Sequence, residues 1–120
     1  MSIIENLSEL SLQYFALVRQ LSSKFELTLS QTFILLSIPF DGVTVSDLSE
    51  KLGIDISTMT RNIQRVEKKK LIKRLPNPND KRSIKLFLSK RGSTLNNSIN
   101  SEISISLETI LNKYDLKISN

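Results

Sequence analysis

Two short amphipathic segments joined by Gly53-Ile54-Asp55 constrain the fold of this 120-residue chain more than any other feature. The run Thr44-Val45-Ser46-Asp47 resembles a capping box and predicts the start of the first helix, which Gly53 would end as a C-cap. Asp55 predicts the N-cap of a second helix that runs from Ile56 to about Lys70. Two short helices with so brief a connection are typical of a helix-turn-helix, and the chain is long enough for one such domain.

A β-hairpin and three further helices are expected around this pair. Alternating apolar residues predict strands at 71–75 and 83–88, on either side of the polar turn 76–80. The expected fold class is therefore mainly α with a small β-hairpin. Apolar residues at three- and four-residue steps predict the other helices, which are 3–25, a short one from Thr28 that stops before Pro39, and one from Ser89 to about Asp115.

The last of these helices carries an apolar stripe that includes Leu95, Ile103 and Leu111. A domain of this size cannot cover a stripe of that length by itself. We therefore infer that a second chain covers it.

The second helix of the pair has an apolar side and a basic side. Arginines on its exposed side can reach guanine edges or phosphates, and a glutamine there can pair with adenine. The short side chains of Ser57 and Thr58 would let the helix start approach a groove. The alternative interpretation is an ordinary solvated basic face. At about 100° per residue, the inward sector holds Ile56, Met59, Ile63 and Val66, and the outward sector holds Ser57, Arg61, Gln64, Arg65 and Lys68.

Positive charge is concentrated in one part of the chain, whose formal net charge is +5. Residues 61–91 hold twelve Lys or Arg and two acids, whereas the rest of the chain has a net charge of −5. Such segregation indicates a surface that faces a polyanion, with a solvated charged face as the alternative. Within the predicted hairpin turn, Arg82 is the candidate for entering a minor groove, and we expect Asp80 to hold its guanidinium in a forked salt bridge. The alternative is a trivial surface ion pair.

The chain contains no cysteine and no histidine. Disulfides, thiol redox sensing and zinc sites built on Cys or His are therefore excluded, and the sequence offers no nucleophile–base pair for an enzyme. We expect no enzymatic activity, no metal and no cofactor. No apolar run is long enough to cross a membrane, and residues 1–9 carry two acids and no Lys or Arg. We thus expect a cytoplasmic protein without a secretory signal or membrane partner.

Six segments follow one another in a fixed order and spacing: Leu27–Gln31, Val45–Gly53, Ser57–Arg61, Val66–Ile72, Pro78–Arg82 and Leu88–Gly92. Through them the chain resembles the MarR family of bacterial regulators (multiple antibiotic resistance regulators). The Asp-x-Arg of residues 80–82 is the most specific of these features. In overall length the chain is similar to the compact staphylococcal accessory regulators, a related group.

The resemblance implies a winged helix-turn-helix at residues 27–89, flanked by dimerisation helices at 1–26 and 90–120. Members of the family are homodimers in which the first and last helices form the interface. Many release DNA when a small phenolic or lipophilic effector binds. The residues expected in the dimer interface are Leu7, Leu10, Tyr14, Leu107, Ile110, Leu111 and Tyr114.

For function, the resemblance implies a sequence-specific regulator of transcription, and we expect a repressor that binds a pseudopalindromic operator in double-stranded DNA. The helix from Ile56 to about Lys70 would enter the major groove as the recognition helix. The predicted hairpin would form the wing, and its Arg82 would enter the adjacent minor groove. The alternative is a winged-helix module that binds another protein and no DNA. The expected DNA contacts are Ser46, Ser57, Thr58, Thr60, Arg61, Gln64, Arg65, Lys68, Asp80, Lys81, Arg82 and Lys85.

Two features depart from the family pattern. Lys70 stands at the end of the recognition helix, where the family often has glycine, so we expect that helix end to differ in detail. The sequence also ends at Asn120, before the family's usual last helix. We therefore expect the dimer interface to rest on residues 3–25 and 90–115.

Overall fold

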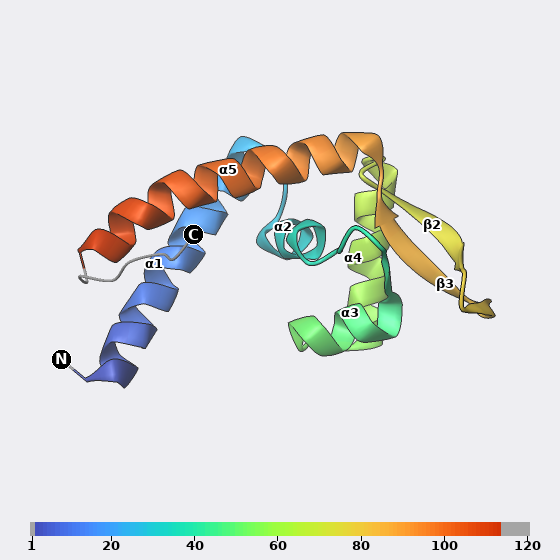
Figure 1. Cartoon of the computed structure of the whole chain (residues 1–120), viewed down its shortest axis with the longest axis horizontal. Helices are drawn as coiled ribbons and strands as arrows, with labels where there is room; N and C mark the ends of the chain where they lie inside the picture. Colours follow the sequence, from blue (N-terminus) through green and yellow to red (C-terminus); the bar gives the residue numbers. More distant parts are fainter. Residues whose placement is uncertain (1, 114–120) are drawn as a thin grey trace. The chain divides into compact units, whose positions relative to one another are not determined.

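The computed structural model describes residues 2–113 and divides them into two compact units (Figure 1). Unit 1 comprises residues 2–29 together with 98–113, and unit 2 comprises residues 30–97. Unit 2 holds the predicted helix-turn-helix and hairpin. The expected fold class is confirmed, because the described residues are mainly helical and contain a small antiparallel sheet.

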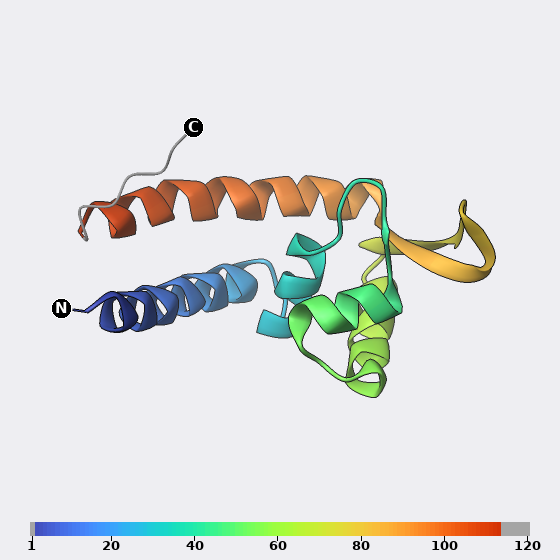
Figure 2. The ribbon, with the colours of Figure 1, turned by 60° about the horizontal axis from the view of Figure 1, so that its bottom comes forward.

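Unit 2 is built from three complete helices, three strands and the beginning of a fourth helix (Figure 2). The sheet has the strand order β1-β3-β2, and both pairings are antiparallel. The elements are α2 (Leu29–Leu36), β1 (Val43–Thr44), α3 (Val45–Leu52), α4 (Ile56–Lys68), β2 (Ile72–Asn77), β3 (Asp80–Leu88) and α5 (Lys90–Asn112).

The helix boundaries follow the predicted caps. Thr44 Oγ1 accepts from the backbone N–H of Asp47 at 3.1 Å, and Gly53 ends α3 in the left-handed region with φ 66°. Asp55 Oδ1 accepts from the backbone N–H of Thr58 at 2.9 Å and so starts α4. Each of these interactions joins residues close to one another in the sequence, which is why the sequence alone predicts them.

The end of α4 is a Schellman motif formed without glycine. The N–H of Lys70 donates to the carbonyl of Glu67 at 2.8 Å, and the N–H of Leu71 donates to the carbonyl of Val66 at 3.3 Å. Lys70 itself has φ 61°, a conformation that glycine adopts more easily than any other residue. Lysine therefore occupies the same left-handed position, and the expected difference in this helix end is one of strain.

The hairpin is longer than the sequence indicated. Its strands extend to Asn77 and from Asp80, so that only Pro78 and Asn79 form the turn. The sheet also contains β1, a third strand that the sequence analysis did not predict, whose Val43 and Thr44 pair with the base of β3. Two residues are too short a run for an alternation pattern to reveal a strand.

The core of unit 2 lies between the helix pair and the sheet. Met59, Ile63 and Val66 of α4 are fully buried, as are Leu48 of α3 and Leu86 of β3. Ile56 does not join them, because 56% of its surface is exposed. The prediction that Ile56 packs inward was wrong, since this first residue of α4 lies at the rim of the packed helix pair.

Unit 1 contains α1 (Ile3–Lys24) and residues 98–112 of α5. Val18, Leu21, Ile99 and Ile103 are buried in it. Lys24 forms an ion pair with Glu102. Of the residues expected in a dimer interface, Leu7 is exposed, and Leu10, Tyr14, Leu107, Ile110 and Leu111 are half-buried. Tyr114 and the expected end of the last helix near Asp115 lie outside the described residues.

Within residues 2–113, no helix is both long and apolar enough to cross a membrane. The same residues contain no cluster of three or more acidic side chains that could hold a metal ion.

Candidate nucleic-acid interface

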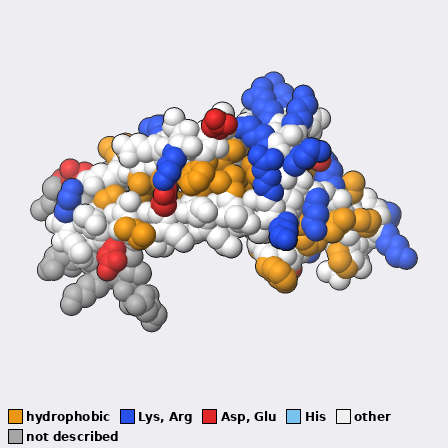
Figure 3. All heavy atoms as spheres, turned by 90° about the horizontal axis from the view of Figure 1, so that it is seen from above, with side chains coloured by type: hydrophobic (Ala, Val, Ile, Leu, Met, Phe, Trp, Pro, Cys, Tyr) orange, Lys and Arg blue, Asp and Glu red, His pale blue; other side chains and the backbone are white. Residues whose placement is uncertain are grey.

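The outward side of α4 carries the candidate recognition residues. Arg61, Gln64, Arg65 and Lys68 are exposed, as is Ser57 at the start of the helix. On the opposite side of the same helix, Met59, Ile63 and Val66 are fully buried and anchor it. Seen from above, Lys and Arg side chains gather on unit 2 (Figure 3). Such a surface attracts a polyanion.

The first turn of α4 is held by its own side chains. The Thr58 hydroxyl donates to Asp55 Oδ2 at 2.9 Å, and Arg61 Nη2 lies 3.4 Å from Thr58 Oγ1. The Thr58 backbone N–H, the Thr58 hydroxyl and the Arg61 charge hold the pKa of the Asp55 carboxyl below its ordinary value. Thr58 is thus half-buried and part of the cap. Thr60 is half-buried as well, whereas Ser46 on α3 is exposed.

The tip of the β2–β3 hairpin presents Lys81 and Arg82 to solvent, and 94% of the Arg82 side chain is exposed. Arg82 Nε lies 3.4 Å from Asp80 Oδ1, which also accepts from the Arg82 backbone N–H at 3.0 Å. The predicted forked salt bridge was therefore wrong. Asp80 forms its shorter bond with the backbone of the turn, because residues two apart in so tight a turn bring that N–H closest to the carboxylate.

Lys85 lies in the middle of the hairpin rather than at its tip. It pairs with Thr44 and Leu75 across the sheet, and its Nζ lies 3.4 Å from the carbonyl oxygen of Asp41. Its side chain is half-buried, unlike those of Lys81 and Arg82. The structure therefore brings the α4 residues together on one face and Asp80–Arg82 together at the tip, with Lys85 apart from both groups.

A fork does exist in unit 2, between residues that the sequence analysis did not pair. Arg74 Nε and Nη2 donate to the two carboxylate oxygens of Glu67 at 2.9 and 2.8 Å. Hydrogen bonding to Glu67 raises the pKa of Arg74 above its ordinary value. One sequence feature could have indicated this ion pair: Glu67 is the single acid between residues 61 and 74, so it is the one local partner for the cations there.

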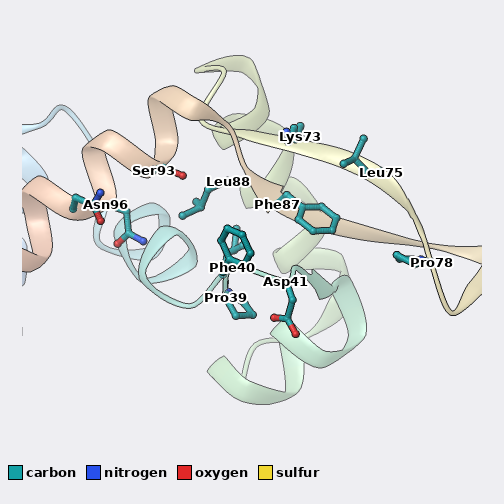
Figure 4. A pocket seen from close by; sticks show the side chains of 12 residues that line it. Pro39, Phe40, Asp41, Lys73, Leu75, Pro78, Phe87, Leu88, Ser93 and Asn96 are labelled. Atoms are coloured by element: carbon teal, nitrogen blue, oxygen red, sulfur yellow. The ribbon is translucent and has the colours of Figure 1, made fainter.

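A groove of about 800 Å³ opens beside the sheet of unit 2 (Figure 4). Its floor and walls are mainly apolar, and Phe40 in the loop after α2 is fully exposed at its edge. Lys73 and Asp41 contribute one charge of each sign. The other lining residues are Ile38, Pro39, Leu75, Pro78, Phe87, Leu88, Ser93, Asn96 and Asn97.

Residues 27–84 match the sequence model of the MarR family. The multiple antibiotic resistance protein MarR of Salmonella typhimurium LT2 is 36% identical over 74 residues, which are 61% of this chain and 51% of that protein. MarR of Escherichia coli K12 is 32% identical over 80 residues, or 66% and 56% of the two chains. The chain thus spans about half the length of the curated relatives that it matches.

Solved structures of MarR from Escherichia coli are similar over nearly the whole chain. The wild-type apo form has a TM-score of 0.81 at 25% identity and covers 98% of this chain and 86% of that one. A mutant of the same protein, complexed with operator DNA, has a TM-score of 0.73 at 26% identity, with coverage of 92% and 79%.

Proposed function

We propose that this chain, whose residues 27–84 match the sequence model of the MarR family, is a member of that family and a sequence-specific regulator of transcription that binds double-stranded DNA as a homodimer. The observation that carries the proposal is the division of α4 into a side anchored by three fully buried residues and an exposed side with Arg61, Arg65 and Lys68. A helix anchored in this way can enter a major groove without losing its packing.

Contacts of two kinds would combine on one duplex. On α4, Arg61 and Arg65 can form paired hydrogen bonds with guanine or contact phosphates, and Gln64 can pair with adenine. At the hairpin tip, the exposed guanidinium of Arg82 can enter the narrow minor groove, where the negative potential is strongest. Lys68 and Lys81 would neutralise phosphates and release counterions.

Dimerisation through unit 1 is supported by its exposed apolar side chains. Several large apolar side chains left exposed on two helices are candidates for a protein interface. A second copy packed there would place two α4 helices on one duplex, so that a pseudopalindromic operator would match the two-fold symmetry. Bound within a promoter, such a dimer would act as a repressor in the cytoplasm. The exposed residues are Ile3, Ile4, Leu7, Leu12, Phe15 and Ile105.

An effector would have a place in the groove beside the sheet. Its volume of about 800 Å³ falls in the range of small-molecule sites. Phe40, Phe87 and Leu88 would contact an apolar or phenolic ring. Because β2 and β3 form one wall, a bound molecule would press on the wing that carries Arg82.

The proposal is tested by fluorescence anisotropy with a labelled random-sequence duplex over a series of salt concentrations. We expect binding at low salt and a linear fall of log K with log salt, with a slope of about −0.9 for each neutralised phosphate. Absence of duplex binding at low salt would overturn the proposal and favour the protein-binding module instead.

A further inference from the structure

The wing is the hairpin of β2 and β3, and its outer half is a two-stranded ribbon. Strand β1 pairs only with Leu86 and Lys85 of β3, so beyond this point β2 and β3 have no third strand beside them in the described part of the chain. Ile84, which lies on this outer part, is 49% exposed, and Leu75, opposite Lys85 where β1 ends, is 42% exposed. Figure 2 shows the ribbon projecting from the helices of unit 2. Its direction must therefore be set at its base.

The tip of the ribbon is tied together by its own side chains. Asn77 Nδ2 donates to Ser83 Oγ at 3.0 Å, and Asn77 Oδ1 accepts from the backbone N–H of Asn79 at 3.0 Å. Ser83 Oγ also donates to the Asp80 carbonyl at 3.2 Å. Because these bonds join both strands and the turn, a change of angle at the base moves Arg82 with the whole ribbon.

The fork between Glu67 and Arg74 lies at that base. Glu67 is in the last turn of α4, and Arg74 is in β2 opposite the buried Leu86 of β3. The two hydrogen bonds of 2.9 and 2.8 Å fix both the distance and the plane of the guanidinium relative to the carboxylate. Among the described residues it is the one ion pair that connects α4 with the hairpin.

We propose that Glu67 is a positioning residue for DNA binding: through Arg74 it holds the wing at the angle to α4 that lets Arg82 and Arg61 reach adjacent grooves of one duplex. This inference rests on the proposed function. Glu67, an acid within the most basic part of the chain, would thereby promote the binding of DNA, a polyanion. The Glu67 carboxylate also makes Arg74 less available to phosphates, since two nitrogens of the Arg74 guanidinium already donate to Glu67.

The sign of one substitution separates this role from simple electrostatics. Glu67→Gln removes a negative charge close to the proposed interface and weakens the fork. Long-range electrostatics alone predicts tighter DNA binding by this variant. The positioning role predicts weaker binding, because the wing loses its fixed angle and Arg82 must be ordered when DNA binds.

The experiment measures the affinity of full-length variants for a duplex that the parent protein selects from a random pool. We expect Glu67→Gln to bind about fivefold more weakly, the effect of an exposed ion pair at the upper end of its usual range. Glu50→Gln, which removes an exposed acid from α3, is the matched control and should bind no more weakly than the parent. The charge-exchanged pair Glu67→Arg with Arg74→Glu should recover most of the affinity.

A double-mutant cycle with the wing completes the test. In an Arg82→Ala background, Glu67→Gln should no longer weaken binding, because the angle matters only through the arginine that the wing carries. Equal or tighter binding by Glu67→Gln, or an unchanged penalty in the Arg82→Ala background, would overturn the positioning role while leaving the proposed function intact. Failure of the parent protein to bind any duplex would instead overturn the proposed function.

Discussion

Gly92 in the first turn of α5 faces the carbonyl oxygen of Leu71 so closely that a β-carbon at Gly92 would lie 1.9 Å from that oxygen. The start of α5 thus packs by direct backbone contact against the segment that follows α4. Gly92→Ala should therefore force the two backbones apart and lower the free energy of unfolding by on the order of 3 kcal/mol. Urea unfolding followed by circular dichroism measures the change.

The matched control for this substitution is Asn97→Ala, an exposed position in the same helix. It should change the free energy of unfolding by less than about 0.5 kcal/mol. A Gly92→Ala variant as stable as this control would show that the contact between Gly92 and Leu71 is looser than described.

A second prediction concerns the left-handed residue that follows α4. Lys70→Gly should stabilise the protein by about 0.5–1 kcal/mol, because glycine adopts a φ near 61° without the steric cost that lysine bears. Lys70→Ala removes the same charge but keeps the β-carbon, so it should bring no gain. Thermal unfolding of both variants under the same buffer conditions distinguishes relief of strain from loss of charge.

A third prediction concerns acid stability. The pKa of Asp55 in the folded chain is below its ordinary value of 3.8, so its contribution to stability is present above that value and is lost as the pH falls through the lower folded pKa. Asp55→Asn keeps a good N-cap but does not titrate. The free energy of unfolding of this variant should therefore fall less steeply than that of the parent below about pH 4. If the free energies of unfolding of the variant and the parent fell equally with pH, the role of the Asp55 carboxylate would be contradicted.

A fourth prediction isolates the wing. Arg82→Ala should weaken duplex binding by about tenfold or more and reduce the salt slope by about one unit. Arg19→Ala, at an exposed position on α1 in unit 1, removes an equal charge far from the proposed contacts along the sequence and serves as the control. Equal losses for the two variants would mean that only net charge matters and that the wing has no specific part.

The features that the sequence predicted are those set within a few residues. The caps at Thr44, Gly53 and Asp55 and the two sides of α4 depend on neighbours along the chain or on helical periodicity, and the structure has them as expected. Ile56 is the exception within α4, since periodicity gives the direction of a side chain but not where the neighbouring core ends.

The features that the sequence did not predict depend on partners brought together by folding. Asp80 and Arg82 are close in sequence, which made a fork between them plausible, yet the fork forms between Glu67 and Arg74 across two elements. Lys85 was predicted as a DNA contact from its place in the hairpin sequence. In the structure β1 pairs with β3, and Lys85 therefore lies beside the loop at Asp41. Charge pairing between elements requires the register, which local patterns do not specify.

Selection of duplexes from a random pool by the full-length protein tests the central proposal most directly. We predict an enriched motif with two-fold symmetry whose half-sites are centred about 10–10.5 base pairs, or one helical turn, apart. Such a motif requires both a dimer and two α4 helices that read adjacent major grooves. A pool that remains unenriched after selection at low salt would contradict the account.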